Sequence, residues 1–322
     1  MRAAYAKRID ALYPLRGLEV GDIAEAPVPD SWVTVNVRAA SINHHDLWSL
    51  RGAGLTEDRL PMILGTDAAG VTDDGREVIV HAVLGDPDRG YGDDTKDPQR
   101  QILSEWVPGT FAERVRVPAR NLVDKPAGLS WESAACLPTA WLTAYRMLTT
   151  HGHGVPGETV LVQGAGGGVS TAAILLGKMM GLRVWVTSRE EAKRVWARDI
   201  GADAAFAPGE TVPDPVDLVI ETVGAATWQH SVDSVRFGGR IVVSGITSGA
   251  MPGADLLSIL AKVITVQGSV CGTTAELKEL ANALVHSGVT PIIDRVLPLE
   301  RIHEGLEAME KGQLRGKVVL HV

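Results

Sequence analysis

One glycine-rich segment, TVLVQGAGGGVSTAAILLGKMMG, constrains the fold of this chain more than any other. An apolar, strand-like stretch over 159–163 runs directly into the turn Gly164, Ala165, Gly166, Gly167 and Gly168, and a helical pattern of apolar residues begins at Val169. Glycines allow a tight turn and a close backbone approach to an anion, which the N-terminus of the helix stabilises. The segment therefore predicts a phosphate-binding turn between a buried strand and a helix.

The order of elements around this turn indicates a dinucleotide site. The complete pattern needs a strand before the turn, a helix after it and a further strand, and all three are present. Ser170 stands where the pattern expects its last glycine. That glycine serves close helix–strand packing, and serine is small enough to replace it there.

Strands and helices alternate through the second part of the chain, which predicts a parallel sheet covered on both faces. We assign this domain to residues 125–288. Its strands are expected at 159–163, 183–188, 216–222, 240–245 and 263–269.

Residues 1–124 instead contain short extended stretches separated by proline and glycine, such as WVTVNVRAAS, REVIVHAV and FAERVRVP. We expect a mostly-β domain there, completed by residues 289–322. In that last part, LERIHEGLEAMEKG predicts a helix, and GKVVLHV predicts a strand that returns to the first domain. A longer helix is expected over 131–148, and the Asp-rich stretch GDPDRGYGDDTKDPQR is expected to be a solvated loop.

Length, charge and cysteine content exclude several classes of protein. The chain has 322 residues, which favours two domains, and its net charge of −8 argues against a nucleic-acid partner. Its two cysteines, Cys136 and Cys271, form no CxxC pair, so neither a disulfide framework nor a four-cysteine zinc site is expected. We find no apolar stretch long enough for a membrane span and no signal peptide, and expect a cytoplasmic protein.

The residues after the second strand of the α/β domain bear on the type of dinucleotide. NAD-binding domains place an acidic residue there to bind the ribose hydroxyls. This chain has Ser188 and Arg189, followed by Lys193 and Arg194, and these groups suit a 2′-phosphate. Glu190 and Glu191 are acidic alternatives, but the spacing from Ser188 to Glu191 is that of a helix capping box. We therefore expect NADPH as the cofactor.

Several motifs together resemble the medium-chain dehydrogenases/reductases, and within that superfamily the zinc-free quinone oxidoreductases. The motifs are NHHDLWSLRG, LGTDAAG, GTFAERVRVP, LPTAWLTAY, VLVQGAGGGVSTAA, ETVG and RGKVVL. The resemblance covers essentially the whole chain. It implies a GroES-like, mostly-β catalytic domain and a Rossmann-type, doubly wound parallel-sheet domain.

The resemblance also bears on zinc. Zinc-containing relatives have a cysteine ligand where this chain has Asn43 and a histidine where it has Thr66, and a third ligand would fall near Cys136. One thiol with an amide and a hydroxyl does not make a zinc site. His44 and His45 are adjacent and expected on an extended segment, so they point in opposite directions, and we interpret them as surface or hydrogen-bonding residues. We predict no metal.

Hydride transfer without a metal favours acceptors that spread negative charge, such as quinones, enones and enals. By resemblance, Asn43 donates its amide hydrogen to the acceptor oxygen or positions it, Thr66 lies nearby, and Asp67 has a supporting role. Trp48 and Arg51 match positions at the pocket mouth, although a packed tryptophan and a solvent-facing arginine fit equally well. No general acid is evident in the sequence, and water is a possible proton source.

Further residues resemble cofactor contacts of the superfamily: Thr139, Val223, Gly224, Gly245 and Lys317. The stretch VITVQGSVCGT resembles the sheet edge through which relatives form homodimers, and an uncovered apolar edge would favour aggregation. The predicted function is NADPH-dependent reduction of a small quinone or enone. An alcohol dehydrogenase or carbonyl reductase of the same superfamily, and a non-catalytic NADPH-binding sensor, are the alternatives.

Overall fold

A computed structural model describes all residues, 1–322, and divides them into two compact units. Unit 1 comprises Met1–Leu142 and Thr273–Val322, and unit 2 comprises Thr143–Gly272. The boundaries differ from those expected at 124 and 289. Residues 125–142 and 273–288 belong to unit 1 because their helices α2 (Trp131–Ala135) and α8 (Thr274–Ser287) pack against strands of that unit.

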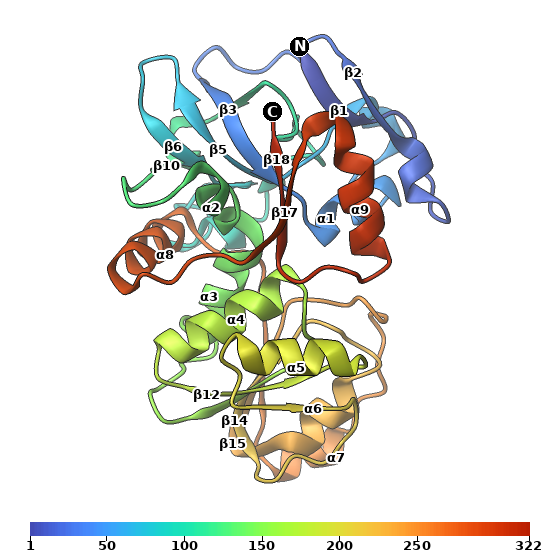
Figure 1. The fold of residues 1–322 in the computed structure, drawn as a ribbon, viewed down its shortest axis with the longest axis vertical. Helices are drawn as coiled ribbons and strands as arrows, with labels where there is room; N and C mark the ends of the chain where they lie inside the picture. Colours follow the sequence, from blue (N-terminus) through green and yellow to red (C-terminus); the bar gives the residue numbers. More distant parts are fainter. The chain divides into compact units, whose positions relative to one another are not determined.

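Unit 1 is built on a seven-stranded sheet with the order β10-β6-β5-β3-β18-β17, in which β9 also pairs with β3. The chain's last strand, β18, lies between β3 and β17, so the C-terminal segment completes the first domain as predicted (Figure 1). The strands are β3 (Val33–Ser41), β5 (Asp67–Thr72), β6 (Glu77–Val80), β9 (Arg114–Val117), β10 (Leu122–Asp124), β17 (Ile293–Pro298) and β18 (Lys317–His321).

Smaller elements complete unit 1. They are the strands β1 (Arg2–Ala6), β2 (Leu18–Asp22), β4 (Met62–Ile63), β7 (Val83–Leu84) and β8 (Gln101–Ile102), the helices α1 (His44–Leu50) and α9 (Ile302–Glu310), and the 3₁₀ turns η1 (Pro14–Gly17), η2 (Glu57–Arg59), η3 (Asp94–Lys96), η4 (Ala119–Asn121) and η6 (Leu299–Arg301). Alternate apolar side chains of β3, β5 and β18 enter one buried core with Leu47, Phe111 and Leu306. Burial of these side chains fixes the register of the central strands.

The helix expected over 131–148 is interrupted. The chain forms α2 as far as Ala135, a π-helical turn η5 (Leu137–Trp141) and then α3 (Leu142–Leu148). Pro138 has no backbone N–H and cannot continue the ladder of α-helical hydrogen bonds. A π-helical turn is the type of irregularity that often occurs at functional sites, and Thr139 lies within this one.

Unit 2 is a six-stranded parallel sheet with the order β13-β12-β11-β14-β15-β16, which confirms the predicted doubly wound fold. The strands are β11 (Thr159–Val162), β12 (Arg183–Thr187), β13 (Ala204–Phe206), β14 (Val216–Glu221), β15 (Val235–Val243) and β16 (Thr265–Gly268), and the helices are α4 (Gly168–Met179), α5 (Glu191–Asp199), α6 (Trp228–Ser234) and α7 (Leu256–Ala261). The short strand β13 was not predicted, and β15 begins earlier than the expected residue 240.

Candidate active site

A buried polar cluster forms where three neighbouring strands of unit 1 meet. Ser41 ends β3 and lies opposite Asp67 of β5, and Val319 of β18 lies on the other side of Ser41. Asn43 follows β3, and Lys317 begins β18. The sheet register thereby brings together side chains that are far apart in the sequence.

Lys317 is the charged centre of this cluster, and its residue is only 3% exposed. Its ammonium donates to the backbone oxygen of Ile42 at 2.8 Å, to Asn43 Oδ1 at 2.6 Å and to Asp67 Oδ2 at 3.3 Å. An ammonium has three hydrogens and no acceptor, so all its donors are used. All three partners of Lys317 lie within unit 1, and its expected cofactor contact stays a prediction.

A line of hydrogen bonds leads outward from Asn43. Asn43 Nδ2 lies 3.1 Å from Thr66 Oγ1, and the hydroxyl oxygens of Thr66 and Thr139 are 3.0 Å apart. Asn43 and Thr66 are buried, whereas Thr139 is half-buried. The amide of Asn43 is thus directed at Thr66, and the group at the accessible end of the line is the Thr139 hydroxyl.

Asp67, at the start of β5, is the acidic residue of the cluster. Its residue is fully buried, and its Oδ2 accepts hydrogen bonds from the Ser41 hydroxyl at 2.9 Å and from Lys317. The same serine hydroxyl lies 2.9 Å from the backbone oxygen of Ala135 in α2. Asp67 therefore balances the charge of the lysine.

The two adjacent histidines begin helix α1 and do not lie on an extended segment as expected. Successive residues of a helix also point in different directions, and the two side chains have different surroundings. His44 is exposed, whereas His45 Nε2 lies 2.7 Å from Glu105 Oε1. Burial disfavours the charged imidazole of His45, but the hydrogen bond to Glu105 raises its pKa above the ordinary value.

Asp46 stabilises the start of α1. Its Oδ2 accepts the backbone N–H of Asn43 at 2.7 Å, as the N3 residue of a capping box does. Burial raises the pKa of Asp46 to about 6. The carboxyl therefore holds Asn43 in place at the N-terminal end of the helix.

The guanidinium of Arg51 lies over the ring of Trp48 and is also paired with a residue of α9. The guanidinium carbon of Arg51 lies 5.8 Å from the centre of the Trp48 ring, and its Nη2 lies 2.8 Å from Glu310 Oε1. This ion pair gives Arg51 a structural partner within unit 1. A substrate contact of Trp48 or Arg51 remains a proposal.

In unit 2 the glycine-rich turn has the backbone that a phosphate requires. Gly164 and Gly166 have φ values of +89° and +94°, a region that favours glycine. Gly167 is the N-cap of α4 and no side chain caps this helix end, which leaves its first amides open. Ser170 is buried, and its hydroxyl donates to the backbone oxygen of Gly167 at 3.1 Å. The turn therefore fits a dinucleotide pyrophosphate, and serine is accommodated in place of the last glycine.

At the end of β12 the basic side chains have different partners. Lys193 Nζ is paired with Glu190 Oε1 at 2.8 Å, and Arg194 is paired with Glu191. The exposed side chain of Arg189 has no ion-pair partner within the chain. Of the predicted basic residues, Arg189 is therefore the one available for a 2′-phosphate.

The predicted capping box is wrong. Helix α5 begins at Glu191 with Glu190 as its N-cap, and no side chain caps it. Ser188 is 7% exposed, and its Oγ lies 3.4 Å from the backbone nitrogen of Glu190. Glu191 pairs with Arg194 and takes no part in capping.

The residues after β14 and β15 that were expected to contact the cofactor also have structural roles within unit 2. The backbone amides of Val223 and Gly224 donate to Glu221 Oε1 at 2.8 and 3.0 Å. A Cβ at Gly245 would lie 2.3 Å from the backbone oxygen of Thr222, so close chain packing requires glycine there. Sequence reasoning missed the role of Glu221, a fully buried carboxylate, although it lies in the motif ETVG.

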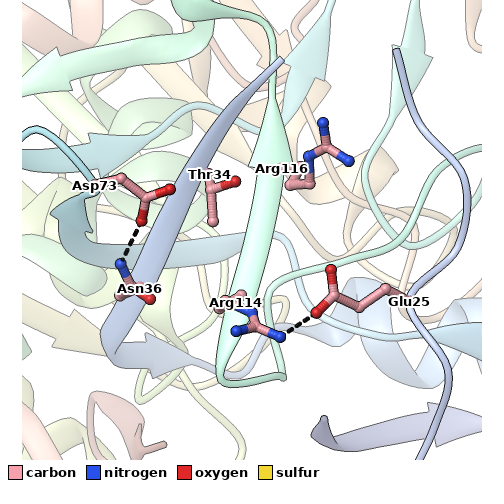
Figure 2. Close-up of a pocket in the computed structure, with 6 residues that line it drawn as sticks. All are labelled: Glu25, Thr34, Asn36, Asp73, Arg114 and Arg116. Atoms are coloured by element: carbon pink, nitrogen blue, oxygen red, sulfur yellow. Dashed lines mark hydrogen bonds and ion pairs between the residues drawn. The ribbon is translucent and has the colours of Figure 1, made fainter. Parts of the chain in front are cut away.

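A surface pocket elsewhere on unit 1 is lined by paired polar side chains (Figure 2). It lies over the paired strands β3 and β9. Arg114 is paired with Glu25, and Asn36 Nδ2 donates to Asp73 Oδ1 at 3.0 Å. A third lining group, Arg116, donates from Nη2 to the backbone oxygen of Pro29 at 3.3 Å.

Comparison with known proteins gives the family. The alcohol dehydrogenase GroES-like domain matches residues 29–127, and the zinc-binding dehydrogenase domain matches residues 168–286. A solved NAD-dependent alcohol dehydrogenase is 32% identical, with a TM-score of 0.90 and full coverage of both chains. The chain belongs to the medium-chain dehydrogenase/reductase superfamily.

Two curated members of this superfamily show the range of its chemistry. An alcohol dehydrogenase of Geobacillus stearothermophilus is 28% identical over 95% of this chain and 96% of its own. An acryloyl-coenzyme A reductase of Sulfurisphaera tokodaii is also 28% identical, over 95% of this chain and 97% of its own. The chain is therefore an oxidoreductase of the medium-chain type, and superfamily membership leaves the acceptor open.

The donor atoms of this member do not fit the zinc that its matched domain is named for. The cluster offers an amide, three hydroxyls, an ammonium and the single carboxylate of Asp67, and no three His, Cys, Asp or Glu side chains gather anywhere in the structure to hold a metal. Cys136 is buried, which raises the pKa of its thiol to about 12, and a single thiol does not complete a zinc site.

Proposed function

We propose that this protein is an NADPH-dependent reductase that transfers hydride to quinones or α,β-unsaturated carbonyl compounds without zinc. The observation that carries the proposal is the polar cluster of Lys317, Asn43, Thr66 and Thr139, which contains hydrogen-bond donors and no metal-binding set. Neutral donors are sufficient for an acceptor that delocalises the new charge, whereas a localised alkoxide requires stronger stabilisation.

The cofactor proposal depends on both units. Bound NADPH would supply the hydride, and the open amides of the glycine-rich turn at Gly164–Gly168 would bind its pyrophosphate. Arg189 would bind the 2′-phosphate through charge-assisted hydrogen bonds. Superfamily resemblance adds Thr139, Val223, Gly224 and Gly245 as further contacts.

At the acceptor, the chain's own residues orient the oxygen and stabilise its charge. One hydroxyl of the Thr66–Thr139 pair would donate toward the acceptor oxygen, while Asn43 acts through Thr66 as a positioning residue. Asp67 and Lys317 support Asn43 from within unit 1. The product anion would take its proton from water, since no side chain at the accessible end of the cluster is a general acid.

The relatives support two acceptor classes. The acryloyl-coenzyme A reductase acts, by its name, on a conjugated carbonyl compound, which agrees with the proposal. The alcohol dehydrogenases favour a second candidate, oxidation of an alcohol or reduction of a simple carbonyl, and one of them is named as NAD-dependent.

The proposed homodimer rests on the outer edge of the sheet in unit 2. Strand β16 pairs only with β15, and all its residues are exposed. Apolar side chains of the neighbouring helix and turn are also exposed, including Leu257, Leu260 and Val263 at 73–75%. A second copy of the same edge offers both the missing backbone partners and an apolar surface.

The test is NADPH oxidation against a panel of quinones, enones, enals and simple ketones, with and without a chelator, and with NADH for comparison. We expect turnover of conjugated acceptors that the chelator does not change, together with a preference for NADPH. A preference for simple ketones or alcohols, lost on chelation and accompanied by stoichiometric zinc, would establish the alcohol dehydrogenase alternative instead.

A further inference from the structure

Lys317 determines how the amide of Asn43 is oriented. The ammonium can only donate, so the Asn43 atom 2.6 Å from it must be the carbonyl oxygen. The NH₂ group of Asn43 then faces Thr66 Oγ1 at 3.1 Å and must donate to it. The positions of the two amide atoms are therefore fixed by chemistry.

The orientation of the Asn43 amide determines how many hydroxyl hydrogens of Thr66 and Thr139 remain free. Thr66 and Thr139 together carry two hydroxyl hydrogens, and the 3.0 Å bond between them uses one. Asn43 accepts neither, because its oxygen is turned toward Lys317 and its NH₂ group fills a lone pair of Thr66. One hydroxyl hydrogen is left over, whichever way the two hydroxyls rotate.

We infer that Lys317 is a positioning residue that makes the Thr66–Thr139 pair a net hydrogen-bond donor toward the acceptor oxygen. With the amide reversed, the Asn43 oxygen would accept from Thr66, Thr66 would accept from Thr139, and no hydrogen would remain. The inference rests on the proposed function and deepens it: the spare hydrogen favours a ligand oxygen that can accept it, such as a carbonyl or a delocalised oxyanion.

The sharpest variant is Asn43→Asp, which has nearly the same shape. Both carboxylate oxygens accept, so one can still bind Lys317 while the other takes the hydrogen of Thr66 and removes the spare donor. We expect kcat to fall by about 100-fold, the usual effect of losing one such donor. The Kd for NADPH, measured by fluorescence, should change less than about twofold.

Asn43→Asp also adds a negative charge, so a charge-neutral variant is needed. The double variant Lys317→Met/Asp67→Asn removes both buried charges, frees the amide to reverse and should also lower kcat. Its matched control is Lys178→Met/Asp203→Asn, which removes an exposed pair at 2.8 Å that does not touch the cluster. Melting curves would establish that each variant is folded. A loss in Asn43→Asp alone would show that added charge is responsible and would overturn the inference.

A second readout does not depend on turnover. In the presence of NADP⁺, 4-nitrophenol serves as the probe, because its phenolate is a delocalised oxyanion that absorbs visible light. A spare donor should lower the pKa of the bound phenol in the wild-type protein, and Asn43→Asp should raise it again. Failure to bind the probe, or an equal pKa of the bound phenol in both proteins, would contradict the inference.

Turnover of the acceptor panel that is unchanged in the variants would also contradict the inference, while leaving the proposed function intact. A probe shift without any turnover would support the donor cluster and reject the proposed function.

Discussion

Single residues of this protein differ greatly in how far their chemistry can be anticipated. Asn43 and Thr66 are recognisable because they stand at positions where zinc-containing relatives have ligands. Lys317 is different: its position in RGKVVL suggested a cofactor contact, and only the register of β18 against β3 places its ammonium on Asn43. Which partner a long side chain reaches depends on tertiary packing, which the local sequence does not contain.

Asp46 should make the free energy of unfolding of the protein decrease as the pH rises. Its pKa is about 6 in the folded protein against an ordinary 3.8, because burial outweighs the opposing charge of His45 and the hydrogen bond from Asn43. The folded state therefore holds a proton that the unfolded state releases, so this group's contribution to stability falls as pH rises from about 4 to about 6.

Replacing Asp46 with Asn removes this contribution and keeps an acceptor for the Asn43 amide. The free energy of unfolding of Asp46→Asn, relative to wild type, should increase by about 2 kcal/mol between pH 4 and pH 7. Urea denaturation at several pH values measures the difference, with the exposed Asp30→Asn as control. A difference that stays constant with pH would show that Asp46 ionises like an ordinary carboxyl.

Elements with a regular pattern follow the sequence closely. The apolar strands of unit 2 and the glycine-rich turn lie where periodicity places them, because buried parallel strands are short, continuous apolar runs. The expected helix over 131–148 is interrupted instead, since Pro138 cannot bond as an α-helix requires. Capping at α5 also differs, because Glu190 and Glu191 form ion pairs in place of a cap.

The turn after β12 carries the proposed choice of cofactor. Replacing Arg189 with Glu should weaken NADPH relative to NADH by tenfold or more, since a hydrogen bond to a charged group contributes roughly 1.5–3 kcal/mol and the new carboxylate repels a phosphate. Steady-state KM values for both cofactors measure this ratio. Arg183→Glu is the control, because Arg183 is exposed at the opposite end of the same strand. If the ratio of the two KM values is unchanged in Arg189→Glu, another residue selects the cofactor.

At the scale of the whole molecule, each unit has its own core and its own part of the proposed chemistry. Unit 1 carries the donor cluster, and unit 2 carries the glycine-rich turn. No helix in the structure is both long and apolar enough to cross a membrane. Strand β16 lies at the edge of the sheet in unit 2, where its outer side has no strand to pair with in a single chain.

The proposed homodimer predicts a mass in solution of twice that of one chain. Replacing Val266, which is 44% exposed in the middle of β16, with Lys should shift the protein toward the monomer, because a charged side chain blocks pairing between edge strands. Light scattering after gel filtration measures the mass. Val285→Lys on α8 is a control with a similar exposure of 39%. A wild-type monomer would contradict the proposal directly.

The sequence by itself determined the local architecture of this protein: the order of most strands and helices and the phosphate-binding turn. These features depend on residue type and on spacing along the chain. The tertiary structure alone decided that β18 brings Lys317 to Asn43, that Glu221 binds the amides after β14, and that residues 125–142 and 273–288 join unit 1. The physical reason is that strand pairing and burial join residues hundreds of positions apart, and only packing selects which buried polar groups satisfy one another.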